Sequence, residues 1–276
     1  MGGKTWRIGV LTAALSVGGC AGIGEAGGAA GTFAPVTTET LSVATVRVPE
    51  PGFWHGTPER PTGGFEYGIA AALAERFGLG DLEVIEVPFD RIVTGDFGGA
   101  DLALADITVT PERAERISFS TPYLAAPPAI LVRAGAEVAD VATAKDLKWA
   151  VERGTTLEAA LRDLVDPGEP PLVAATETEV VERVDDGHVD AALIDLPVAL
   201  GYARQSDGRL AVTAQLPSDA VLAIAMPRGS ANVEPVDSAL RALSSQGEIA
   251  ALARRWLDSD LEGGRVQQVR VLRTGS

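Results

Sequence analysis

Cysteine and histidine are scarce in this sequence, which has one cysteine, Cys20, and two histidines in 276 residues. One cysteine cannot form a disulfide within the chain or a cysteine-based zinc site. His55 and His188 do not have the spacing of metal ligands. We therefore expect neither a metal ion nor another cofactor.

Basic residues are also few, since 23 lysines and arginines stand against 38 acidic residues and the net charge is −15. Such a chain cannot neutralise phosphates, which excludes DNA and RNA as partners. Aromatic residues contribute only 5%, but apolar residues make up 46% of the chain, so it is neither disordered nor fibrous. The length allows one large domain or two small ones with real hydrophobic cores.

The apolar run near the N-terminus, residues 8–17, is too short to cross a bilayer as a helix. Lys4 and Arg7 precede it and small residues follow, a pattern that predicts an export signal over residues 1–19. Val17-Gly18-Gly19-Cys20 resembles the bacterial lipobox, which implies a lipid on Cys20 and anchoring on the extracytoplasmic face of the cell membrane. Residues 20–40 would then be the lipidated cysteine and a flexible tether. The alternative is a plain secretory signal with an incidental cysteine.

The segment 101–113 combines a strand, a polar turn and a helix start. Its apolar run 102–107 has the length of a buried strand, and residues 110–112 (Thr-Pro-Glu) are typical of the first positions of a helix. Arg113 would then lie beside the unpaired amides of the helix N-terminus. Free N–H groups, a partial positive charge and a guanidinium together suit a small carboxylate. An ordinary capped helix with a solvated Arg113 is the alternative.

Strand and helix patterns alternate from Leu41 onward and predict two α/β lobes. We expect lobe 1 to comprise residues 41–125 and 223–260, lobe 2 residues 126–222, and residues 261–276 to be a tail of low order. The chain would cross between the lobes near Tyr123–Pro127 and again near Asp219–Leu222. Two crossings form a hinge, and ligands favour the cleft between lobes.

Lobe 2 offers a second set of polar residues at strand ends. Thr155 and Glu158 match a capping box, and the free amides around Thr155 and Thr156 could hold the other edge of a carboxylate. Asp195 ends the apolar run 190–195 and could either cap the next helix or pair with a ligand ammonium. With Arg113 on the facing lobe, these residues would bind both charged groups of an amino acid. A well-capped helix without a ligand role is the alternative for Thr155 and Thr156.

The motifs of the chain from Leu41 to Leu257, in their order, resemble those of the family 3 extracellular solute-binding proteins, which bind amino acids for ABC importers. The resemblance implies an α/β, two-lobe, hinged, periplasmic-binding-protein-like (type II) fold, with each lobe a sheet flanked by helices. The motifs are Gly64-Phe65-Glu66, Thr108-Val-Thr-Pro-Glu-Arg113, Phe119-Ser-Thr-Pro-Tyr123, Gly154-Thr155-Thr156, Gly187-His-Val-Asp-Ala191 with Asp195, and Ala253-Arg-Arg-Trp256.

The same resemblance implies roles for individual residues. Arg113 corresponds to the arginine that binds the α-carboxylate, with Thr108 as its partner at the strand end. Thr156 corresponds to the lobe 2 residue that also holds the carboxylate, and Asp195 to the acid that takes the α-ammonium. Phe89 matches an aromatic residue that often lines the side-chain pocket.

The sequence departs from the family pattern at several positions. Asp106 stands where a small residue is usual, and an Asp106 facing the cleft would favour a cationic or hydroxyl-rich ligand, because an unpaired buried carboxylate is unfavourable. Gly68 replaces the second acid of the family's Gly-Phe-Asp-x-Asp. Phe53 or Trp54 could supply the missing aromatic residue of lobe 1, or both could pack in the core.

These observations predict a lipid-anchored, monomeric binding protein, not an enzyme, that delivers a polar or basic amino acid to an ABC transporter permease. One alternative is an enzyme on the same scaffold, similar to a cyclohexadienyl dehydratase. It would need a cleft carboxyl as general acid, and Asp106 and Glu66 are the candidates. A ligand-sensing partner of a membrane receptor is a further alternative.

Overall fold

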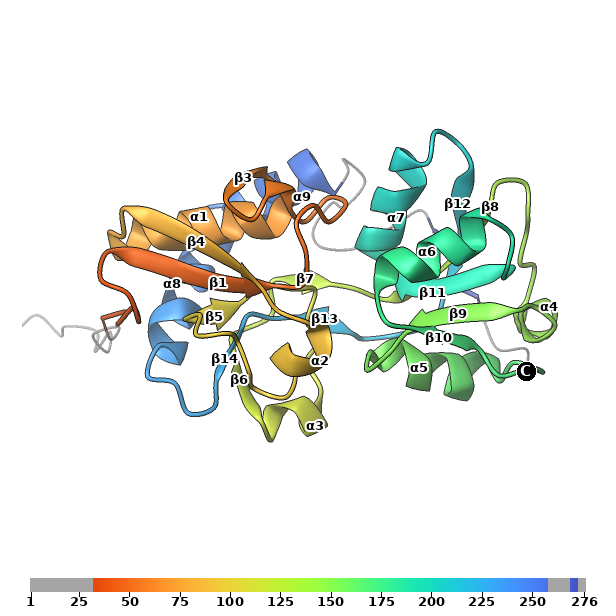
Figure 1. Cartoon of the computed structure of the whole chain (residues 1–276), viewed down its shortest axis with the longest axis horizontal. Helices are drawn as coiled ribbons and strands as arrows, with labels where there is room; N and C mark the ends of the chain where they lie inside the picture. Colours follow the sequence, from red (N-terminus) through yellow and green to blue (C-terminus); the bar gives the residue numbers. More distant parts are fainter. Residues whose placement is uncertain (1–31, 258–268, 273–276) are drawn as a thin grey trace, which may run out of the picture.

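The computed structural model describes residues 32–257 and 269–272. The expected export signal and Cys20 lie outside the described residues. The described chain forms two lobes side by side, each built on a five-stranded sheet (Figure 1). Within these ranges, none of the helices has the length and hydropathy that a membrane crossing requires.

The sheet of lobe 1 has the strand order β4-β1-β5-β14-β6. β1 pairs in parallel with both β4 and β5, whereas β14 is antiparallel to β5 and β6. Parallel strands covered on both faces are expected to be mainly apolar, and Leu41, Val43 and Ala44 of β1 are fully buried. The strands are β1 (Thr40–Thr45), β4 (Asp81–Glu86), β5 (Leu102–Ala103), β6 (Ile117–Phe119) and β14 (Ala225–Pro227).

Helices α1, α8 and α9 pack against one another on lobe 1, and α1 also contacts β1 and β4. Helix α1 ends at Gly78, whose φ of 69° is the left-handed conformation that glycine adopts most readily. A short hairpin of β2 (His55–Thr57) and β3 (Arg60–Gly63), not anticipated from the sequence, precedes α1. The helices are α1 (Phe65–Phe77), α2 (Phe89–Ile92), α3 (Pro111–Ala114), α8 (Val233–Ser245) and α9 (Glu248–Trp256).

Lobe 2 has a mixed sheet of order β10-β9-β11-β8-β12, in which β9, β10 and β11 run parallel. Its strands are β8 (Pro128–Arg133), β9 (Trp149–Glu152), β10 (Leu172–Ala174), β11 (Ala191–Asp195) and β12 (Leu210–Gln215). Its helices are α4 (Val141–Lys145), α5 (Thr156–Ala160), which continues as a π-helical turn (Leu161–Val165), α6 (Glu177–Asp185) and α7 (Leu196–Gln205).

Two short strands join the lobes. β7 (Leu124–Ala125) and β13 (Val221–Leu222) pair in an antiparallel manner and run between the two sheets (Figure 1). Both fall in the segments where the sequence predicts crossings. Such a two-stranded connection lets the lobes move as units about the hinge.

Both ends of the described chain correct the sequence-based boundaries. The flexible tether does not extend to residue 40, because Phe33 is 8% exposed and stacks on Phe77 with 4.3 Å between ring centroids. The tail is not of low order at residues 269–272, since Leu272 is buried and its N–H donates to the Gln215 carbonyl at 2.7 Å. In both cases buried apolar side chains stabilise the contact, and the tail also pairs with the edge strand β12.

Candidate functional site

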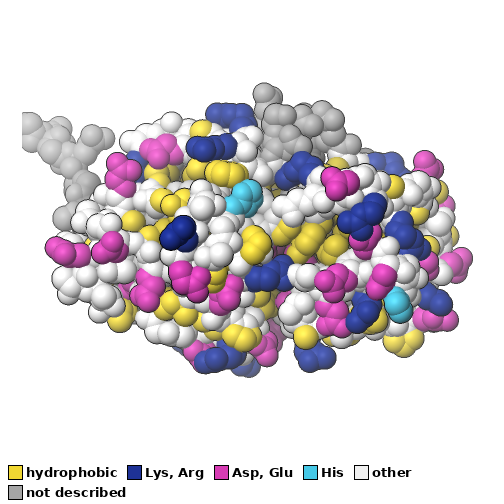
Figure 2. Space-filling view, turned by 45° about the horizontal axis from the view of Figure 1, so that its top comes forward, with side chains coloured by type: hydrophobic (Ala, Val, Ile, Leu, Met, Phe, Trp, Pro, Cys, Tyr) yellow, Lys and Arg dark blue, Asp and Glu magenta, His cyan; other side chains and the backbone are white. Residues whose placement is uncertain are grey.

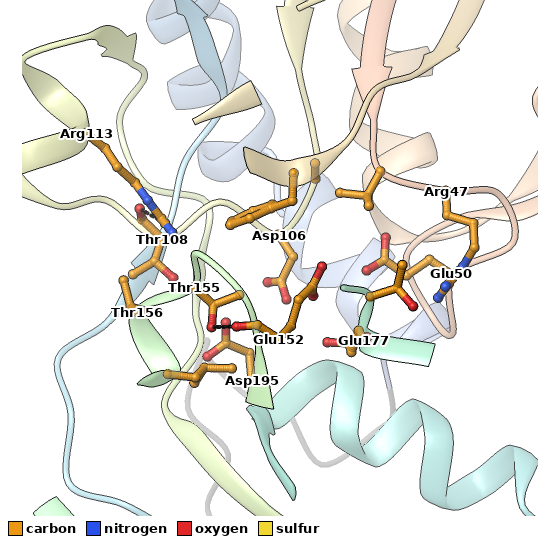
Figure 3. Close-up of a pocket in the computed structure, with 15 residues that line it drawn as sticks. Arg47, Glu50, Asp106, Thr108, Arg113, Glu152, Thr155, Thr156, Glu177 and Asp195 are labelled. Atoms are coloured by element: carbon orange, nitrogen blue, oxygen red, sulfur yellow. Dashed lines mark hydrogen bonds between the residues drawn. The ribbon is translucent and has the colours of Figure 1, made fainter. Parts of the chain in front are cut away.

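The two lobes enclose a pocket of about 570 Å³, including the part open to solvent. Most of its lining residues follow the carboxyl ends of parallel strands, where ligands bind in open α/β sheets. Figure 3 shows their side chains converging from both lobes. The lining residues are Val46, Arg47, Glu50, Phe89, Ala105, Asp106, Thr108 and Arg113 of lobe 1, and Glu152, Thr155, Thr156, Leu157, Thr176, Glu177 and Asp195 of lobe 2.

Arg113 is held in the pocket wall by the start of helix α3. The hydroxyl of Thr110 accepts a hydrogen bond from the Arg113 N–H at 3.1 Å and caps the helix. The guanidinium donates to the Thr108 carbonyl at 2.8 Å and lies over the Phe89 ring, 5.1 Å from its centroid. Burial lowers the pKa of Arg113, but an arginine stays protonated in proteins. The pocket therefore has a fixed cation at this end.

Asp195 faces the same pocket from lobe 2. It ends β11 and is 7% exposed, and its side chain makes no capping bond to helix α7. The capping alternative for Asp195 is therefore wrong. Burial raises the pKa of Asp195 to about 7, although Arg113 opposes this shift. A ligand ammonium beside it would favour the charged carboxylate.

The turn before helix α5 differs from the predicted capping box. Thr155 is the N-cap residue, but its hydroxyl donates to the Glu152 carbonyl at 2.8 Å instead of capping the helix. The Glu158 carboxylate accepts from the Gly154 N–H at 2.7 Å, one residue before the position that a capping box requires. Thr155 and Thr156 both line the pocket at the helix start.

Asp106 lines the pocket, and Figure 3 shows its side chain pointing into it. Its φ of 51° is left-handed. The strand β5 covers only Leu102–Ala103 and is far shorter than the predicted 102–107. The N–H of Asp106 donates to Glu66 at 2.9 Å, and its buried Oδ1 has no hydrogen-bond partner. Burial and the nearby Asp195 raise the pKa of Asp106 well above its usual range.

Trp54 does not line this pocket, so its predicted ligand role is wrong. It is fully buried in the core of lobe 1 with Phe53. Its indole N–H donates to Glu66 at 2.9 Å, and Glu66 also accepts the hydroxyl of Tyr123. A buried carboxylate that accepts several hydrogen bonds holds its neighbours in place, so the Phe53–Trp54 segment is fixed inside the lobe.

Sequence reasoning missed four charged residues of the pocket: Arg47, Glu50, Glu152 and Glu177. Glu152 is the last residue of β9, and Arg47 and Glu177 lie within a few residues of the ends of β1 and β10. The rule that ligands bind beyond the carboxyl ends of parallel strands would have pointed to these three. Glu50 lies in the loop after β1, where no sequence pattern marked it.

Burial and mutual repulsion act on the pocket carboxyls of lobe 2. The pKa of Glu177 is raised to about 8 by burial and by Glu152, although Arg47 opposes the shift. The pKa of Glu152 is raised to about 7 by burial and by Glu50. The face drawn in Figure 2 differs, because acidic and basic side chains are interspersed over both lobes there.

Several contacts bridge the lobes across this pocket. The Arg113 guanidinium donates to the Gly154 carbonyl at 3.3 Å, and Arg47 donates to the Tyr202 hydroxyl at 2.9 Å and to Thr178. The described lobes are therefore closed on each other. Among the described residues, no group of three or more histidine, cysteine, aspartate or glutamate side chains is arranged to hold a metal ion.

Known proteins with similar sequences are binding proteins. The L-cystine-binding protein TcyJ of Escherichia coli (strain K12) is 28% identical over 203 residues, which cover 72% of this chain and 75% of TcyJ. The arginine-binding extracellular protein ArtP of Bacillus subtilis (strain 168) is 26% identical over 205 residues, which cover 71% of this chain and 78% of ArtP.

Similar solved structures have the type II periplasmic binding fold. An ancestral arginine-binding protein bound to arginine has a TM-score of 0.70 and 27% identity, and the match covers 79% of this chain and 98% of that one. An amino acid ABC transporter substrate-binding protein from Streptococcus pneumoniae, bound to L-arginine, has a TM-score of 0.70 and 26% identity, covering 79% and 94%. The sequence profile of the bacterial extracellular solute-binding proteins, family 3, matches residues 43–259, and the chain belongs to this family.

Proposed function

We propose that this protein is a lipid-anchored, extracytoplasmic binding protein that captures a polar or basic amino acid and delivers it to the permease of an ABC transporter. The observation that carries the proposal is the position of Arg113 and Asp195, which border one pocket from opposite lobes. An amino acid has a carboxylate and an ammonium on one carbon, so one ligand head group would contact both lobes.

Arg113 is the expected partner of the carboxylate, because a guanidinium can donate two parallel hydrogen bonds to it. The hydroxyls and amides of Thr155 and Thr156 would hold the other edge of the carboxylate. Asp195, with no capping bond, would accept the ammonium. A ligand that contacts both lobes binds the closed form more tightly than the open form and so shifts the population toward closure.

The relatives support this proposal. The names of TcyJ and ArtP state that these proteins bind cystine and arginine, and the streptococcal structure is that of an ABC transporter substrate-binding protein. The lipid anchor is supported by the lipobox resemblance around Cys20. We expect the protein to act as a monomer.

Isothermal titration calorimetry and thermal melting against the twenty amino acids test the proposal. A ligand at a hundredfold excess over its Kd stabilises the protein by about 2.7 kcal/mol. We expect at least one polar or basic amino acid to bind and to raise the melting temperature. The absence of both effects for every amino acid would contradict the proposal.

An enzyme similar to cyclohexadienyl dehydratase remains the second candidate, because Asp106 places a carboxyl of raised pKa in the pocket. Glu66, the other candidate acid, lies inside lobe 1 and accepts hydrogen bonds from Asp106, Trp54 and Tyr123. We rank this function lower, because a pocket with more carboxylates than arginines disfavours a dianion such as prephenate. Turnover of prephenate or arogenate by the purified protein would reverse this ranking.

A further inference from the structure

A second group of charged residues occupies the end of the pocket opposite Arg113. Figure 3 shows Glu50 and Glu177 beside Arg47 at this end, whereas Arg113, Thr108 and Thr156 lie at the other. Glu50 comes from the loop after β1 in lobe 1, and Glu177 begins helix α6 in lobe 2. The two carboxylates therefore approach one space from opposite lobes. We call this end the distal subsite.

One oxygen of each carboxylate in the distal subsite lacks a hydrogen-bond donor. Glu50 is 7% exposed, and its Oε2 atom is buried without a partner. The Oε1 atom of Glu177 is likewise buried without a partner. Buried polar atoms in native proteins nearly always have a partner, so two such acceptors aimed at a pocket indicate that a donor is supplied from outside the chain.

Arg47 does not supply these hydrogen bonds, although it lies in the distal subsite. Its guanidinium donates to the Pro49 carbonyl at 3.2 Å, to the Tyr202 hydroxyl at 2.9 Å and to Thr178. These bonds hold Arg47 between the lobes, and none of them goes to the two unpaired oxygens. Arg47 thus lowers the repulsion in the subsite without satisfying its acceptors.

The charge of the whole pocket favours the same kind of ligand. Five carboxylates and two arginines line it, so its formal charge is −3 when all are ionised. A neutral zwitterion leaves this excess unchanged, whereas a ligand with a cationic side chain reduces it. Because the pocket is buried, opposite charges interact there more strongly than in water.

We propose that Glu50 and Glu177 form a subsite for the guanidinium or ammonium of a ligand side chain, which makes a cationic amino acid such as arginine the preferred ligand. This inference rests on the proposed function, because the α-carboxylate and α-ammonium must be bound at the Arg113 end. The side-chain cation would then bridge the lobes at a second point. The raised pKa of Glu177, about 8, is consistent with a carboxylate that lacks its cation.

Titration of the full-length protein with L-arginine and L-citrulline tests the inference, because the two ligands have nearly the same shape and citrulline is neutral. We expect arginine to bind about 100-fold more tightly or better, since a buried charged group rejects a ligand that leaves it unpaired. Glu50→Gln and Glu177→Gln should each reduce this preference at least about tenfold while citrulline still binds. Glu182→Gln is the matched control, because Glu182 is an exposed residue of the same helix α6.

The outcomes separate the two proposals. If both ligands bind the unaltered protein with similar Kd values, the distal subsite is wrong but amino-acid capture stands. If arginine is preferred and the preference survives in both variants, the cation is recognised elsewhere and the inference is also overturned. If no amino acid binds, the proposed function fails and the inference fails with it. Melting curves of the ligand-free variants show whether they are folded.

Discussion

Replacing Arg113 with alanine should weaken amino-acid binding more than any other single change at the Arg113 end. Arg113 is 8% exposed, so the bond of its side chain to a ligand carboxylate would be largely shielded from water. Removing one partner of a buried, hydrogen-bonded charge pair costs about 2–5 kcal/mol. At about 1.4 kcal/mol for each tenfold change, this corresponds to an increase in Kd of roughly 30- to 4000-fold.

Two further variants identify the cause of such a loss. Arg113→Lys keeps the positive charge but cannot form the two parallel hydrogen bonds of a guanidinium, so we expect an intermediate Kd. Arg116→Ala removes the same charge from an exposed position three residues further along the chain and should leave Kd within about twofold. Calorimetry measures each Kd, and thermal melting without ligand checks that each variant is folded.

Two results would refute this reasoning. If Arg113→Ala bound every amino acid as tightly as the unaltered protein, the carboxylate partner would lie elsewhere. If Arg116→Ala lost as much affinity as Arg113→Ala, the effect would come from the overall charge of the protein and not from a contact in the pocket.

Three more predictions concern closure and stability. Gly201→Ala should weaken ligand binding about 5- to 150-fold, which calorimetry measures. A Cβ at Gly201 would lie 2.8 Å from the Pro51 carbonyl oxygen of the facing lobe and so would oppose closure. Glu66→Gln should lower the free energy of unfolding by about 1–3 kcal/mol, which urea unfolding measures. The amide N–H₂ of glutamine would face one of the N–H groups of Trp54 and Asp106 that now donate to the Glu66 carboxylate. The ligand-free lobes should open as the pH rises from about 5 to above about 8, because the pKa of Asp195 is raised to about 7 and that of Glu177 to about 8. X-ray scattering would report this opening as a larger radius of gyration.

The sign of the pH effect follows from linkage. A carboxyl whose pKa is raised in the closed form binds a proton there more tightly than in the open form, so closure is favoured at low pH and disfavoured as the pH passes the raised value. The arginines of the pocket oppose this effect but stay charged throughout the range. The groups that face one another are Glu50, Asp106, Glu152, Glu177, Asp195 and Tyr202, together with Arg47 and Arg113. A radius of gyration that is constant or falls with rising pH would contradict the prediction.

The other two predictions also have distinct controls. Gly201→Ala should not destabilise lobe 2, since alanine favours a helix more than glycine does, and an unchanged Kd would show that the lobes do not approach at Pro51. For Glu66→Gln, an unchanged unfolding free energy would mean that the hydrogen bonds from Trp54 and Asp106 contribute little.

The sequence alone determined the two-lobe fold and the chemistry of the Arg113 end. Alternating strand and helix patterns are local, so they predicted two α/β lobes, and the predicted crossing segments are those that pair as β7 and β13. Arg113 and Asp195 were identifiable because each follows a strand end and stands beside a helix start, a combination visible within a few residues. The structure brings both to one pocket, where their ligand roles remain predictions.

The tertiary structure alone decided what occupies the rest of the pocket. Glu50 and Glu177 are far apart in the sequence, and only the closure of one lobe on the other places both in the same space. The sequence left open whether Trp54 lines the pocket or packs in the core, because it does not show which way a loop side chain turns. In the fold its indole is held inside lobe 1 by Glu66. Asp106 faces the pocket because of a left-handed backbone and a buried hydrogen bond. Such directions depend on contacts between distant segments, which local patterns do not encode.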